Sequence, residues 1–79
     1  MTDKEWKELC EWAEKKYPEN IITDKCYCID MLLKDHNVLE FTKLGRIVIH
    51  KDIGDLSIRF NLEYNRTAKQ IKTIIENLL

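Results

Sequence analysis

The fold is decided by LSIRFNLEY, residues 56–64, in which apolar and polar side chains alternate without interruption. Successive side chains of a β-strand point to opposite sides of a sheet, so this stretch predicts a strand with one buried face and one solvated face. The predicted buried face carries Leu56, Ile58, Phe60, Leu62 and Tyr64. Such a strand needs other strands beside it and an apolar layer against its buried face.

Two more strands are predicted immediately before it. Residues 38–43 form the first, a turn follows at Gly45, and residues 46–51 form the second. A tight connection over residues 52–55 then leads into residues 56–64. Because these connections are short, we expect an antiparallel meander whose middle strand is 46–51.

Helices are predicted on either side of the strands. Thr2 and Glu5 have the spacing of a capping box, and an apolar stripe at helical spacing follows as far as Tyr17. Pro18 ends this helix, because the residue before a proline disfavours the helical conformation. Thr67 is the expected N-cap of a second helix, which has a wide apolar stripe.

Residues 20–36 admit two interpretations. Asp24 suits the N-cap of a helix over residues 25–36, with Asn37 as its terminator. A strand is the alternative, since apolar side chains also alternate there, at Tyr27, Ile29, Met31 and Leu33. The helix is favoured because the Leu-Leu-Lys sequence at residues 32–34 suits a helix end better.

Together these elements predict one α+β domain over residues 1–79. It is a three-stranded antiparallel meander packed on one face by two or three helices, in the order α-(α)-β-β-β-α. A chain of 79 residues supports one modest core and leaves little room for an enzyme-sized cleft. The sequence has no long apolar run, signal peptide or lipidation motif. We therefore expect no membrane partner and a cytoplasmic protein, in the host cytoplasm if a phage encodes it.

No pattern predicts catalysis, a cofactor or a metal site. Ser57 lacks the glycine-flanked turn of an activated nucleophile, and neither histidine can be placed beside it from sequence. Cys26 and Cys28 would point apart on a helix. On a strand they would share a face, but the other ligands that zinc needs are distant in sequence. The expectation is a non-enzyme with free thiols.

The element order also resembles that of a double-stranded RNA-binding domain, which is helix–strand–strand–strand–helix. The segment from Arg66 to Lys72 is similar to the lysine-rich start of that family's last helix. The resemblance implies that Arg66, Lys69 and Lys72 contact phosphates. The family's Gly-Pro-x-His loop is absent, and a net charge of −1 gives no strong field toward nucleic acid. Nucleic-acid binding is therefore the alternative function.

Binding to another protein is the function that the sequence favours. The predicted contact residues lie outside the expected core and are Trp12, Tyr27, Met31, Arg59 and Asn61. Aromatic and large apolar side chains outside a core are enriched among interface anchors. If residues 56–64 form an edge strand, their free backbone groups invite another strand, from a second protein or in a homodimer.

Small size, an Ile-, Lys- and Asn-rich composition and the lack of catalytic motifs match the general profile of phage or mobile-element inhibitors. We expect an inhibitor of the anti-defence type that occludes a surface of its partner.

Overall fold

The computed structural model describes the backbone of residues 1–53, 56–63 and 65–79, and the side chains of these residues except 24, 35, 52, 53, 57 and 60–63. The helices and strands are α1 (Asp3–Lys16), β1 (Ile21–Lys25), β2 (Cys28–Leu32), β3 (Val38–Thr42), β4 (Ile47–Ile53), β5 (Leu56–Glu63) and α2 (Ala68–Leu78). Two short 3-10 turns, η1 (Pro18–Asn20) and η2 (Lys34–His36), flank the first hairpin. The predicted α+β class is confirmed.

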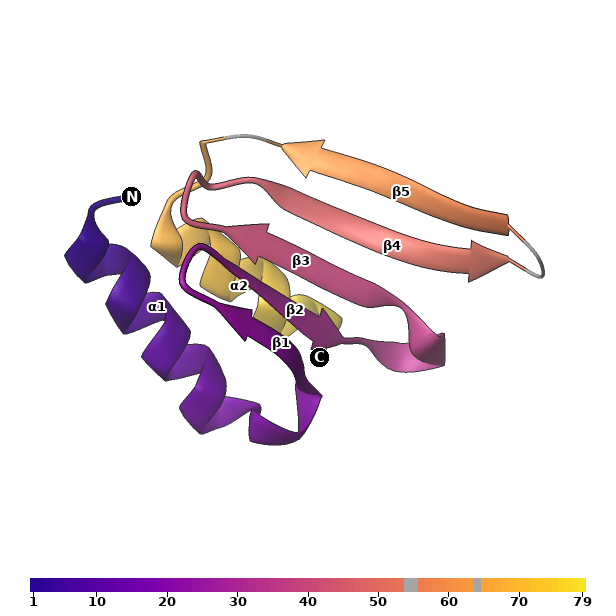
Figure 1. Ribbon diagram of the computed structural model, residues 1–79, viewed down its shortest axis with the longest axis horizontal. Coiled ribbons are helices and arrows are strands. Elements are labelled where there is room, and N and C mark those ends of the chain that lie inside the picture. The colour runs from indigo at the N-terminus through magenta and orange to yellow at the C-terminus, as the bar shows by residue number, and fades with distance from the viewer. Residues whose placement is uncertain (54–55, 64) are drawn as a thin grey trace.

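The strands form one antiparallel sheet in the order β1-β2-β3-β4-β5 (Figure 1). Each strand pairs with the next one along the chain, so the sheet is a meander. The predicted meander is therefore present, but it has five strands in place of three. β4 pairs with both β3 and β5, as expected for the middle one of the three predicted strands.

The helix favoured for residues 20–36 is wrong. The segment forms the β1–β2 hairpin, with Cys26 and Tyr27 in its turn. Ile29 and Met31 are fully buried and lie two residues apart on β2, which is the spacing of one strand face. Helix propensity differs by less than about 1 kcal/mol between ordinary residues, whereas burying one such side chain contributes about 1.5–3 kcal/mol. The burial of Ile29 and Met31 therefore outweighs helix propensity, and the segment forms strands.

Both predicted terminal helices are present, and each begins with a capping box. In α1 the Glu5 N–H donates to the Thr2 hydroxyl, and the Thr2 N–H donates to the Glu5 carboxylate, both at 3.1 Å. Thr67 and Gln70 exchange the same two bonds at the start of α2. Each such cap contributes about 1 kcal/mol to helix stability. Neither helix, within the described chain, has the length and apolar character needed to cross a membrane.

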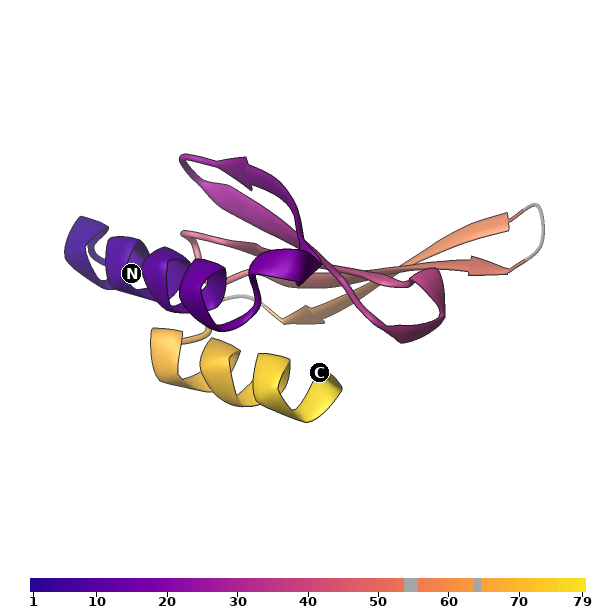
Figure 2. The ribbon, with the colours of Figure 1, turned by 90° about the horizontal axis from the view of Figure 1, so that it is seen from below.

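The helices lie on the same side of the sheet (Figure 2). Their inner faces join alternate residues of β2, β3 and β4 in one core, made of Trp6, Leu9, Ala13, Ile29, Met31, Leu39, Phe41, Ile47, Ile71 and Ile75. Trp6 links α1 to the β1–β2 hairpin by a hydrogen bond, in which its Nε1–H donates to the Cys26 carbonyl at 2.8 Å. Its ring also meets Phe41 edge-on, with centroids 5.9 Å apart.

The far half of the β4–β5 hairpin projects beyond both helices (Figures 1 and 2). Leu56 was predicted to be buried, but it is 68% exposed, because it pairs with Ile53 at this projecting end. The alternating pattern of β5 therefore does not correspond to a uniformly buried face. Tyr64 and the hairpin residues 54–55 lie outside the described residues.

A β-bulge interrupts the alternation near the end of β5. Asn61 pairs with Val48, whereas Glu63 pairs with Ile47, so Leu62 is an extra residue between the two pairs. An extra residue of this kind interrupts the regular pairing of a strand with its neighbour. The side chains of residues 60–63, and Tyr64 as a whole, lie outside the described residues, so the predicted face is not described at this end.

Candidate functional site

The face of the sheet opposite the helices, here called the open face, gathers polar side chains from four strands. They are Cys28, Asp30, Glu40 and His50, which alternate with core or core-facing positions of their strands, and Arg59, which shares this face because it pairs with His50. The register sets Asp30 opposite Glu40 and His50 opposite Arg59. In Figure 1 this face is turned toward the reader, and α2 lies behind the strands.

Three side chains that can hold a metal ion converge on the open face, and we call them the β2–β3 cluster: Cys28 and Asp30 from β2, and Glu40 from β3. One ligand atom of each lies within 4.8 Å of those of the other two. The Cys28 Sγ is 3.9 Å from Glu40 Oε2, a weak thiol contact. Cys28 is only 7% exposed. The Oδ1 atom of Asp30 is buried and has no hydrogen-bond partner among the described residues.

The surroundings of the β2–β3 cluster disfavour negative charge. Burial raises the pKa of the Asp30 carboxyl, and the neighbouring Glu40 raises it further, against the opposing effects of His50 and Lys25. Burial is also the largest cause that raises the pKa of the Cys28 thiol, followed by the charges of Asp30 and Glu40. The charged forms of Asp30 and Cys28 are therefore disfavoured in this partly buried place.

Neutralising Asp30 is expected to stabilise the domain in a buffer with a metal chelator. The pKa of Asp30 is raised in the folded state, so loss of the Asp30 proton destabilises the fold. The contribution of this carboxyl to stability is fully present below its ordinary pKa of 3.8 and is lost as the pH rises through the raised pKa of the folded state. The amide of Asp30→Asn carries no charge and can donate to Glu40. We expect a midpoint of thermal unfolding at pH 7 that is higher by roughly 4–8 °C, the shift that 1 kcal/mol produces in a small domain.

The pH dependence provides the control for this prediction. Protonation of the wild-type carboxyl increases as the pH falls toward its ordinary pKa of 3.8, so the difference between wild type and Asp30→Asn should be smaller at pH 4 than at pH 7. A difference that is equal at pH 4 and pH 7, or a less stable variant at pH 7, would contradict an electrostatic origin.

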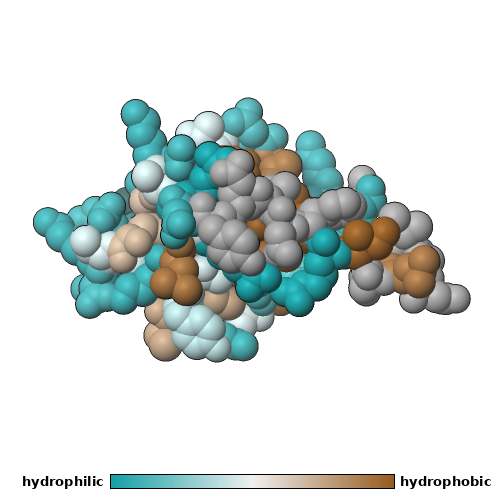
Figure 3. All heavy atoms as spheres, turned by 90° about the horizontal axis from the view of Figure 1, so that it is seen from above, coloured by the Kyte–Doolittle hydropathy of each residue, from teal (hydrophilic) through white to brown (hydrophobic). Residues whose placement is uncertain are grey.

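The outer edge of the sheet is the second notable feature. β5 is the last strand in the sheet order, and no described strand pairs with its outer side. At the projecting end of the hairpin Leu56 is exposed, and Figure 3 shows hydrophobic side chains there, apart from the main body. Arg59 is exposed on the same strand, as expected. The side chain of Asn61 lies outside the described residues.

The other predicted contact residues differ in how exposed they are. Met31 is fully buried in the core, so the expectation that it lies on the surface is wrong. Tyr27 is 58% exposed in the β1–β2 turn. Trp12 is half-buried, and its ring lies 5.4 Å from the Lys16 Nζ and 5.5 Å from the Lys72 Nζ. Trp12 therefore joins α1 to α2 through cation–π contacts, besides any role in binding.

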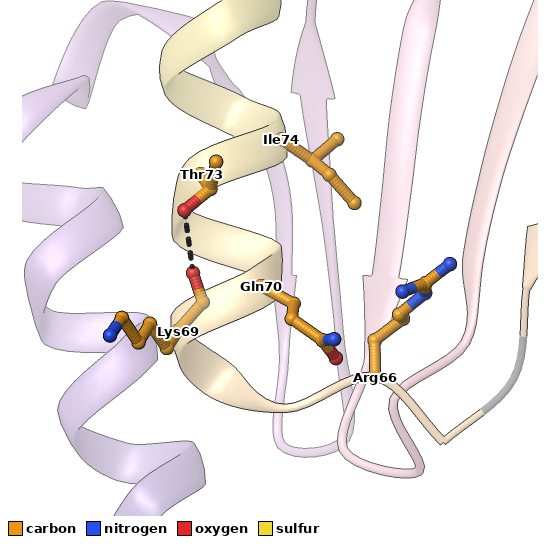
Figure 4. Close-up of a pocket in the computed structure, with 5 residues that line it drawn as sticks. All are labelled: Arg66, Lys69, Gln70, Thr73 and Ile74. Carbon is orange, nitrogen blue, oxygen red and sulfur yellow. Dashed lines mark hydrogen bonds between the residues drawn. The ribbon is translucent and has the colours of Figure 1, made fainter.

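Of the three cations predicted to contact phosphates, two line one hollow and the third packs on an aromatic ring. Arg66 and Lys69 line a hollow of about 380 Å³ beside α2, and they point to opposite sides of the helix (Figure 4). The Lys72 amino group instead lies over the Trp12 ring. The five strands also depart from the three-stranded order on which the resemblance to double-stranded RNA-binding domains rested.

The two cysteines that were considered together for metal binding lie in different surroundings. Cys26 is exposed in the β1–β2 turn, whereas Cys28 is buried on the open face and meets residues of β2 and β3. The pairing of Asp30 with Glu40 depends on the register of two strands, one of which was predicted as a helix. The Cys-x-Asp spacing of residues 28–30 was the only signal in the sequence, and it has meaning only on a strand.

Comparison with known proteins finds no matching family model, no matching curated protein and no matching solved structure.

Proposed function

We propose that the protein is a non-catalytic binding module, which recognises another protein through the outer edge of β5 and occludes the surface that it covers. The observation that carries the proposal is the position of β5, at the edge of the sheet and on a hairpin that extends beyond the helices (Figure 1). The partner that this edge fits is a protein that offers an extended segment.

The backbone of an edge strand supplies the affinity in this mode of recognition. Its outward N–H and C=O groups pair with an added strand, and the side chains on either face give specificity. Many proteins protect such an edge with a covering loop or helix, or with charged residues that point into the sheet. On β5 the described side chains provide one charge, that of Arg59, and it is exposed.

The projecting hairpin also offers an apolar contact. Leu56 is 68% exposed at the start of β5, and Ile58 is half-buried two residues further along the strand. Burying an apolar side chain at a contact contributes about 1.5–3 kcal/mol. A partner strand that lies along β5 would bury Leu56 with little rearrangement of the core, because the core residues lie under the other half of the sheet.

The two most exposed leucines among the described side chains allow a matched test. Leu56 lies at the proposed site, whereas Leu44, which is 79% exposed, lies in the turn between β3 and β4 at the opposite end of the hairpin. We expect Leu56→Asp to keep the thermal midpoint of wild type but to weaken binding of a purified partner at least about tenfold, which corresponds to 1.4 kcal/mol. Leu44→Asp should bind as wild type does.

The partner is first identified by affinity purification with mass spectrometry and then measured as a purified protein by calorimetry. Equal losses for Leu56→Asp and Leu44→Asp would indicate nonspecific adhesion, and an unchanged affinity of Leu56→Asp would contradict the proposed edge. Light scattering of the protein alone tests whether a second copy of this chain, and not another protein, binds the β5 edge. A dimer that Leu56→Asp abolishes would assign the edge to a second copy. An origin in a phage and an anti-defence role remain predictions that identification of the partner tests.

A further inference from the structure

We propose that the β2–β3 cluster, made of Cys28, Asp30 and Glu40, is a binding site for a thiophilic divalent cation, and that Zn²⁺ is the ion it fits best. The site is independent of the proposed protein-binding edge. It lies on the open face between β2 and β3, whereas β5 lies two strands away from β3.

The separations of the donor atoms suit a tetrahedral ion. With Zn–S near 2.3 Å and Zn–O near 2.1 Å, a tetrahedral angle sets a sulfur and an oxygen ligand about 3.6 Å apart. The Cys28 Sγ and Glu40 Oε2 atoms are 3.9 Å apart, and all three donors fall within 4.8 Å of one another. Small side-chain rotations therefore bring the set to coordination distance without a change in the backbone of either strand.

The sheet holds these donors in place. Asp30 and Glu40 are directly paired across β2 and β3, and Cys28 lies two residues from Asp30 on the same face of its strand. Cys28 is itself more than nine-tenths buried, at 7% exposure. A donor set on paired central strands loses little conformational freedom when an ion binds.

An oxygen in the cluster lacks the partner that buried oxygens normally have. Asp30 Oδ1 is inaccessible to solvent and accepts no hydrogen bond from the described residues. A buried polar atom without a partner is destabilising, and such atoms mark places where an ion or water belongs. A cation at the cluster would coordinate the carboxylate and offset the repulsion between Asp30 and Glu40.

The chemistry of the donors selects the class of ion. Carboxylates alone would suit Mg²⁺ or Ca²⁺, but a thiolate favours zinc and its softer neighbours. Three protein ligands leave one of four positions to solvent, the arrangement of an open zinc site. On binding, the Cys28 thiol releases its proton to solvent and forms the Zn–S bond as thiolate.

Cobalt(II) provides a direct test, because a thiolate ligand gives a charge-transfer absorption band that oxygen ligands do not. The protein Cys10→Ala/Cys26→Ser keeps Cys28 as its only thiol. We expect this protein to bind one equivalent of CoCl₂ with that band, and ZnCl₂ to displace the cobalt. In the same background, Cys28→Ser should lose the band.

Conservative changes to the carboxylates provide the second measurement. Asp30→Asn and Glu40→Gln should each weaken zinc binding at least about tenfold. Losing a residue that only hydrogen-bonds to a metal ligand already has an effect of this size, and losing a direct ligand should cost no less. At a hundredfold excess over its dissociation constant, zinc should raise the midpoint of thermal unfolding of Cys10→Ala/Cys26→Ser by at least about 5 °C. It should raise the midpoint of Asp30→Asn in this background much less.

Three results would overturn the proposal. One is a zinc affinity of Cys28→Ser that equals that of Cys10→Ala/Cys26→Ser, which would show that the Cys28 thiolate is not a ligand. Another is the absence of both the band and the thermal shift in Cys10→Ala/Cys26→Ser. If Cys28→Ser fails to fold, as circular dichroism would show, unchanged zinc affinity in both Asp30→Asn and Glu40→Gln decides against the site.

Discussion

Met31→Lys is expected to leave the protein unfolded at 25 °C. Met31 is fully buried on the inner face of β2, in the core that both helices share with the sheet. Its loss removes about 1.5–3 kcal/mol of burial, and placing an unpaired ammonium group in the same space costs several kcal/mol more. The free energy of unfolding of a domain of 79 residues is about 4–12 kcal/mol. The substitution therefore removes most or all of the stability.

The adjacent position on β2 provides a matched control. Leu32 is 38% exposed and points away from the core, so Leu32→Lys should change the free energy of unfolding by less than about 1 kcal/mol. Circular dichroism should show a cooperative thermal transition for Leu32→Lys and none for Met31→Lys. If Met31→Lys were as stable as Leu32→Lys, residues 28–32 would not form the strand described here.

The difference between these neighbours shows why residues 20–36 were difficult to predict. Their apolar pattern fits a helix face and a strand face equally well, and only the presence of β3 beside β2 distinguishes them. Such a pairing is a long-range contact, which local propensity does not report. The strands from residue 38 onward were predicted correctly because short connections join them and the alternation in them is regular.

The candidate site was less predictable than the fold. The cluster of Cys28, Asp30 and Glu40 depends on the register between β2 and β3, which the sequence does not specify once one strand is taken for a helix. The exposure of Leu56 depends on where the helices end beneath the sheet. Both features depend on how the helices and strands are placed relative to one another. Residue spacing along the chain does not predict that placement.

A glycine connects two turns that lie far apart in the sequence. Gly45, in the turn between β3 and β4, has a φ of +80°, and its carbonyl accepts a hydrogen bond from the Arg66 N–H at 3.0 Å. A Cβ atom at this position would lie 2.5 Å from both the backbone N and the backbone O of Arg66. The chain leading into α2 therefore passes directly against the β3–β4 turn, and only glycine leaves room for it.

Gly45→Ala is consequently expected to lower the free energy of unfolding by about 2–5 kcal/mol. A left-handed conformation costs a residue with a Cβ about 1–2 kcal/mol, and the overlap with backbone atoms adds about 1–3 kcal/mol, because backbone atoms cannot rotate aside as a side chain does. Urea denaturation measures the change, and amide exchange in α2 should become faster as its connection shifts. Leu44→Ala, in the same turn at a side chain that is 79% exposed, is the control and should lie within about 0.5 kcal/mol of wild type. Equal stability of the two variants would mean that the β3–β4 turn and the Arg66 segment do not meet as described.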